Sequence, residues 1–173
     1  MSALYRVRQF VRAAGSRIRS DDADTAVAAR YLPPEAVKIF QAMSRYDRQH
    51  ALKVVQALEG QGHTERDLLA AALLHDAGKT VTQEGQVRLW HRVAVVLMHV
   101  ASPNLLERLA RGGQQGWRRP FYVHLTHGAI GAEAAEQAGC SQITVDLIRR
   151  HEDAPGQTHD PLLAALQAAD SEN

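Results

Sequence analysis

A histidine and an aspartate stand side by side at the end of the helix that this 173-residue sequence predicts to be the most buried. His75 and Asp76 directly follow the apolar residues 68–74. A buried imidazole beside a buried carboxylate is unfavourable unless each group has a partner. A coordinated cation would be a partner for both, and histidine is the commonest metal ligand in proteins. The pair therefore predicts a metal site.

The alternative interpretation is a helix end at which His75 and Asp76 turn toward solvent. The apolar pair 73–74 before them and Gly78-Lys79 after them disfavour it. Successive helical side chains point about 100° apart, so both groups reach one site only where the helix lies across its floor.

Four further residues are candidates to meet this pair, each on a predicted helix. His50 lies in the middle of one helix, and His127 begins another. His151 and Asp170 each end a helix. Taken singly, each is more often a surface or capping residue than a ligand. Together they resemble the way in which a helical bundle builds a metal site in its core. The predicted ligand set is His50, His75, Asp76, His127, His151 and Asp170.

The donor types restrict the metal. A mixed set of imidazoles and carboxylates suits iron, manganese, zinc, cobalt or nickel, and disfavours calcium or magnesium alone. We therefore expect divalent transition-metal ions as the cofactor. The other histidines have weaker interpretations: His91 and His99 lie on an apolar predicted helix and suit its core, whereas His63 and His159 suit loops.

The order of these residues resembles a known family. The stretch from Leu73 to Lys79, Leu-Leu-His-Asp-Ala-Gly-Lys, resembles the signature of the HD-domain phosphohydrolase superfamily. His127 with Gly131, then Ile148-Arg-Arg-His151-Glu152 and Ala169-Asp170, resemble its two-metal, HDIG-like branch. The match covers residues 45–170, and the ordered series is more specific than the His-Asp pair alone.

The resemblance implies a division of the ligands between two metals. His50, His75, Asp76 and Asp170 would hold one ion, with Asp76 as the bridge. The remaining two histidines, at positions 127 and 151, would help to hold the second ion.

One departure from the family restricts the substrate. The branch that cleaves cyclic dinucleotides carries a double histidine before the glutamate and a Gly-Tyr-Pro after it. Here Arg150-His151-Glu152 and Pro155-Gly156 have neither feature, which disfavours that substrate. The expected substrate is a small phosphorylated compound, such as a phosphomonoester, a phosphodiester or a nucleotide.

The expected reaction is hydrolysis of a phosphate ester by a metal-bridging hydroxide, since two nearby cations acidify a shared water. Asp76 would set the metal separation, and Lys79 would neutralise a phosphate oxygen as a point charge. From the sequence alone, an exposed lysine after a helix end is an equally good interpretation. His124, three residues before His127, is a candidate second-sphere or substrate-binding group. The predicted catalytic residues are Asp76, Lys79 and His124.

Two other functions remain open. Some relatives of the superfamily use a pair of iron ions to activate oxygen, and the ligand set does not separate them from hydrolases. A catalytically silent sensor or scaffold module is the other alternative, although such modules usually lose ligands. Nucleic-acid binding is not expected, because no basic face with interleaved aromatic residues is present.

The elements that must position these residues are all predicted to be helices, since no convincing strand pattern occurs. We expect an all-α fold: a single compact helical bundle of the HD-domain type, with the metal site in its core. Residues 80–88 and 154–159 are predicted loops. The predicted helices span residues 3–19, 33–40, 45–58, 65–77, 89–101, 104–111, 120–138 or 126–138, 142–151 and 160–170.

Composition agrees with one globular domain over residues 1–173, with residues 1–30 as an N-terminal helical extension and 45–170 as the core. The 20 basic and 19 acidic residues produce no strong field to attract nucleic acid. The single cysteine suits a reducing cytoplasm, where we expect the protein. No run is long enough to span a membrane. The basic segment 3–19 is predicted to pack on the domain rather than on a membrane, and oligomeric state is left open.

Overall fold

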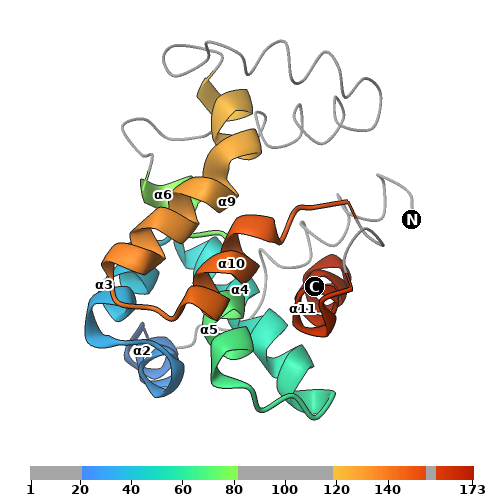
Figure 1. Ribbon diagram of the computed structural model, residues 1–173. Helices are drawn as coiled ribbons and strands as arrows, with labels where there is room; N and C mark the ends of the chain where they lie inside the picture. The colour runs from blue at the N-terminus through green and yellow to red at the C-terminus, as the bar shows by residue number, and fades with distance from the viewer. Residues whose placement is uncertain (1–20, 82–118, 155–158) are drawn as a thin grey trace. The chain divides into compact units, whose positions relative to one another are not determined.

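Figure 1 shows the computed structural model, which describes residues 21–81, 119–154 and 159–173. All regular secondary structure among these residues is α-helical, which confirms the predicted all-α fold. The helices are α2 (Asp21–Tyr31), α3 (Pro34–Ala42), α4 (Arg45–Gly60), α5 (Arg66–Leu74), α6 (Gly78–Val81), α9 (Arg119–Gln137), α10 (Gln142–Arg150) and α11 (Pro161–Glu172). None of these described helices is long and apolar enough to cross a bilayer.

The chain groups into two units by its contacts. One unit comprises residues 19–82 and 127–173, and the other comprises residues 1–18 and 83–126. Of the second unit the structure describes only residues 119–126, the first part of α9. The single domain over 1–173 stays a prediction. The predicted helices at 3–19, 89–101 and 104–111 lie outside the described residues, as do His91 and His99.

Helix α5 is the centre of the first unit. Its residues 68–74 are all buried, as the apolar run predicts. It contacts α4, α10 and α11, which surround it in Figure 1, and also α2 and α3. The largest side chains of this core include Phe40, Leu58, Leu73, Ile148 and Leu166.

The end of α5 differs from its prediction. The sequence predicts one helix over 65–77, whereas α5 ends at Leu74. Residues 75–77 form a tight turn, in which the Ala77 N–H donates to the Leu74 carbonyl at 2.9 Å. Gly78 then begins α6, so residues 80 and 81, predicted as the start of a loop, are helical. His75, the C-cap of α5, still has helical backbone angles, with φ −53° and ψ −34°.

Three of the described helices begin directly after the capping residues that the sequence predicts. The hydroxyl of Ser44 accepts a hydrogen bond from the Asp47 N–H, and that of Ser141 accepts from the Thr144 N–H. The Asp160 carboxylate accepts from the first N–H groups of α11, where Pro161 needs no partner. Ser141 also donates to Asp67 of α5 at 2.6 Å, which ties α10 to the central helix.

The structure adds detail to the predicted helices at α9 and α2. Helix α9 begins at Arg119, which decides between the alternative starts in favour of the earlier one. Helix α2 was not predicted as a separate element, and its apolar residues form no clear stripe. It lies in the first unit, against α3, α4 and α5.

Two glycines let the backbones of α6 and α9 touch, as predicted for Gly131. A Cβ atom at Gly131 would lie 3.1 Å from the Gly78 nitrogen. A Cβ atom at Gly78 would overlap the His127 carbonyl oxygen and lie 2.8 Å from the Gly131 nitrogen. This close approach brings His127 beside the His75-Asp76 turn.

Candidate metal centre

The six predicted ligands converge, although they come from five segments of the chain. His50 lies on α4, and the turn after α5 supplies His75 and Asp76. His127 lies on α9, His151 is the C-cap of α10 and Asp170 lies on α11. All six belong to the unit of residues 19–82 and 127–173.

The donor atoms form two groups that share Asp76. One group joins His50, His75 and Asp76, and the other joins Asp76, His127 and His151. Within each group the candidate ligand atoms lie within 4.8 Å of one another. Such buried groups of histidine and aspartate could hold a metal ion.

Asp170 adds a carboxylate to the first group. Its Oδ1 lies 2.8 Å from the His50 Nε2 and 3.4 Å from the His75 Nε2. The His75 Nε2 is also 3.7 Å from the Asp76 Oδ1. The first group therefore has four convergent donors, as the sequence predicts.

Backbone contacts orient two of the imidazoles. The Nδ1 of His75 lies 2.9 Å from the Ala72 carbonyl oxygen, and the Nδ1 of His151 lies 2.7 Å from that of Ile148. A carbonyl only accepts, so each Nδ1 carries the hydrogen. The Nε2 atoms consequently face the centre, and this is the arrangement in which a second contact fixes the tautomer of a metal-ligating histidine.

A bound cation would explain why four of these polar side chains are buried. His75 is 1 % exposed, His127 is fully buried, and Asp76 and His151 are each 6 % exposed. The His75 Nε2 is buried with no hydrogen-bond partner among the described residues. Its nearest carboxylate oxygen is that of Asp170 at 3.4 Å, and a cation bound between the two groups would satisfy both.

The spacing of the donors also fits a cation. Ligand atoms that each lie about 2.0–2.2 Å from one ion are about 3–3.6 Å from one another. The measured separations of 3.2 Å between His127 Nε2 and His151 Nε2 and 3.5 Å between His127 Nε2 and Asp76 Oδ1 lie in this range. The donors of the second group therefore fit transition-metal ligation in both type and distance. Separations in the first group vary more widely, from 2.8 Å between His50 Nε2 and Asp170 Oδ1 to 3.7 Å between His75 Nε2 and Asp76 Oδ1.

The electrostatics favour positive charge between the carboxylates. Burial by itself raises the pKa of Asp76, but the Lys79 ammonium and the nearby imidazoles hold it well below its usual range. Burial likewise lowers the pKa of His75, yet Asp76 and Asp170 raise it to about 9. The position beside His75 Nε2 therefore attracts a cation, whether a proton or a metal ion.

The pKa of His151, in the second donor group, is shifted in the opposite direction to that of His75. Burial, with His75 nearby, lowers the pKa of His151 to about 4. His151 is therefore neutral at pH 7, as a metal ligand must be. The pKa of Asp170 is lowered, since His75 and His50 outweigh the effect of its burial.

Lys79 belongs to the same cluster. It lies on α6 and forms an ion pair with Asp76, three residues earlier. Burial lowers its pKa and Asp76 raises it, with a net increase. The side chain as a whole is 29 % exposed, and its ammonium group is paired with the buried Asp76 carboxylate.

Two residues of the site were not predicted. Glu152 follows His151, and its Oε1 lies 3.6 Å from the His127 Nε2. Burial, together with Asp76 and Asp170, raises its pKa to about 7. Gln167, one turn before Asp170, donates from its Nε2 to the carbonyl oxygens of the turn after α10. Adjacency to His151 was a signal for Glu152, whereas no sequence pattern indicates Gln167.

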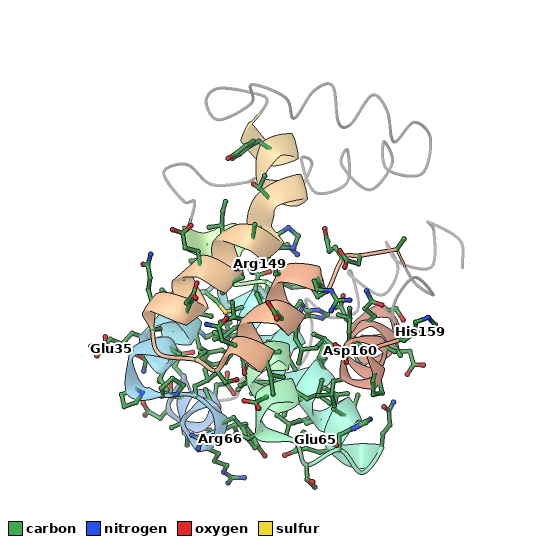
Figure 2. All side chains as sticks on the ribbon, viewed as in Figure 1. Glu35, Glu65, Arg66, Arg149, His159 and Asp160 are labelled. Atoms are coloured by element: carbon green, nitrogen blue, oxygen red, sulfur yellow. The ribbon has the colours of Figure 1, made fainter. Side chains whose placement is uncertain are left out.

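The remaining predicted residues lie elsewhere. His124 is on α9, but its side chain lies outside the described residues. His63 lies in the α4–α5 loop, 3.3 Å from a Glu65 oxygen, and His159 is exposed beside the start of α11, where Figure 2 labels it. Both loop predictions are confirmed.

Comparison with known proteins identifies no relative. No protein-family model, curated protein or solved structure matches this chain. The likeness to the HD-domain superfamily therefore rests on the residues quoted above.

Proposed function

We propose that this chain is a metal-dependent phosphohydrolase of the HD-domain type, which hydrolyses a phosphomonoester, a phosphodiester or a nucleotide. The observation that carries the proposal is the buried pair of donor groups that share Asp76. A single group of this kind occurs in many metalloproteins. Two groups joined through one carboxylate suit a pair of cations held close together, the arrangement used for in-line displacement at phosphorus.

The donor chemistry supports iron, manganese, zinc, cobalt or nickel as the metal. His50, His75, Asp76 and Asp170 would hold one ion, and Asp76, His127 and His151 would hold the other. When bound, such cations act as Lewis acids that activate water and polarise a phosphoryl oxygen.

The protein's own groups would orient and neutralise the substrate. Asp76 is 9 % exposed in its side chain and lies between the two groups, so its carboxylate holds them at a fixed separation. The ammonium of Lys79, whose side chain is 29 % exposed, would contact a phosphoryl oxygen and offset its charge. The side chains of Asp170 and Glu152 are also partly exposed. A role for His124 in substrate binding stays a prediction.

The test combines elemental analysis with a substrate panel. The purified chain is reconstituted with each candidate metal, its metal content is measured, and phosphate release is assayed on monoesters, diesters and nucleotides. We expect about two cations per chain and turnover of at least one substrate class. The Asp76→Asn variant should lose both the metal and the activity.

Asp146→Asn is the matched control, because Asp146 pairs only with Arg149 in an exposed i,i+3 ion pair among the described contacts. Fewer than about one cation per reconstituted wild-type chain would contradict the proposal. Oxygen uptake by the ferrous protein without phosphate release would favour the oxygen-activating alternative. Bound metal without turnover of any substrate would favour the silent module.

A further inference from the structure

The donor group around His127 contains a contact that the predicted ligand set does not use. Three donor atoms surround the His127 Nε2: the His151 Nε2 at 3.2 Å, the Asp76 Oδ1 at 3.5 Å and the Glu152 Oε1 at 3.6 Å. A tetrahedral ligand has three neighbouring ligands, each about 3.4 Å away when the metal–ligand distance is about 2.1 Å. Glu152 therefore supplies a carboxylate oxygen at about this spacing from the His127 Nε2, beside the group of Asp76, His127 and His151 whose donor atoms all lie within 4.8 Å of one another.

The backbone that carries Glu152 is held in place. The residue lies in the turn that follows α10, where the Asp153 N–H donates to the Arg150 carbonyl at 2.9 Å. The Gln167 Nε2 on α11 lies 3.2 Å from the His151 carbonyl oxygen and 2.9 Å from that of Asp153. Glu152 therefore projects from a turn that is anchored on both sides of it.

The exposure of Glu152 agrees with a ligand at the rim of the site. The other three members of the group are 6 % exposed or less, whereas the Glu152 side chain is 46 % exposed. The half-exposed Glu152 side chain nevertheless brings its carboxylate to within 3.6 Å of a fully buried imidazole. A cation between the two groups would account for this approach, since carboxylate oxygens and imidazole nitrogens are both common ligands of transition metals.

We propose that Glu152 is a fourth metal ligand, which completes the group formed by Asp76, His127 and His151. This inference rests on the proposed function, because it takes the second cation as given. The first group already has four donors without it. Glu152 therefore determines the affinity for one ion and not for the other.

The experiment measures metal binding and not activity. Wild type, Glu152→Gln and Asp153→Asn are stripped of metal, and each is titrated with Co²⁺ while its visible absorption is recorded. Asp153→Asn is the matched control, because it removes the same charge one position along the chain, where Asp153 pairs with Arg150. Circular dichroism verifies that the variants are folded.

We expect Glu152→Gln to bind one of two Co²⁺ equivalents at least about tenfold more weakly, with a changed absorption spectrum, because an amide oxygen is a poor replacement for a carboxylate. The other equivalent and the Asp153→Asn titration should match wild type. Two equivalents bound by Glu152→Gln with wild-type affinities would overturn the Glu152 assignment alone. A wild type that binds no Co²⁺ would overturn this assignment and the proposed function together.

Discussion

The Nε2 atoms of His127 and His151 lie 3.2 Å apart in a buried environment, although 24 positions separate the residues in the chain. The Nδ1 of His151 donates to the Ile148 carbonyl, so the neutral His151 ring has only a lone pair to offer at Nε2. Two ring nitrogens at this distance share either one hydrogen or one cation. The nearby Asp76 carboxylate, 3.5 Å from the His127 Nε2, would stabilise the positive charge of either one.

Substitution of Lys79 tests its role toward the substrate. Lys79→Met should lower kcat/KM for the best phosphate ester about 100-fold, since loss of one charge-stabilising donor in an active site has effects of this order. Metal content should stay at the wild-type value, because the ammonium is not a ligand. Steady-state kinetics and elemental analysis measure the two quantities. Lys38→Met is the control, since Lys38 forms an exposed ion pair with Glu35. Equal activity of the two variants would contradict this role.

The pKa of His75 predicts how the metal-free protein responds to pH. Asp76 and Asp170 raise this pKa from 6.5 to about 9 despite the opposing effect of burial. A raised pKa means that the folded state holds the proton more tightly than the unfolded state. The resulting stabilisation is fully present below pH 6.5 and is lost as the pH rises through about 9.

Urea unfolding of metal-free wild type and His75→Gln over this range measures the effect. The free-energy difference between them should fall as the pH rises, because only wild type carries the titrating imidazole. A difference that stays constant, or grows with pH, would show that the carboxylates do not hold the proton on His75.

Gln167 is predicted to position the turn that carries His151. Gln167→Leu removes the amide that contacts the carbonyls of His151 and Asp153. We expect a loss of metal affinity of about 10- to 100-fold, which is typical when a residue that orients a ligand is lost. The free energy of unfolding should fall by about 1 kcal/mol. Gln142→Leu is the control, since its amide contacts Glu136 at the surface. Metal titration that shows the same affinity in both variants would refute the positioning role.

The contact between α6 and α9 predicts a strong effect of a single methyl group. In Gly78→Ala the new Cβ would overlap the His127 carbonyl oxygen, and backbone atoms must then shift. We expect a destabilisation of about 3 kcal/mol, as for overpacking of a rigid contact, measured by urea unfolding. Gly60→Ala adds the same group in open space at the end of α4 and should have little effect. Similar stability of both variants would mean that the two backbones do not touch.

Much of the secondary structure follows from local sequence patterns. Ser44, Ser141 and Asp160 cap the helices that the sequence assigns to them, because a capping side chain bonds to N–H groups only two or three residues away. The apolar run before His75 predicts the buried central helix, because a helix that is apolar on most sides must be covered by other elements. Helix α2 was missed because it has no clear apolar stripe. The turn at 75–77 was missed because no glycine or proline precedes Gly78 there to indicate a helix end.

The sequence by itself determined the all-α class and the types of donor available to a metal. The resemblance to the HD-domain superfamily already implied that His127 and His151 act together and that Asp76 is shared. Only the tertiary structure decided that these donor atoms lie within 4.8 Å of one another, and it adds the contacts of Glu152 and Gln167. The reason is physical. Capping and helical periodicity depend on hydrogen bonds between near neighbours in the chain, whereas the meeting of α4, α9, α10 and α11 depends on how their buried faces and the Gly78–Gly131 contact pack around α5.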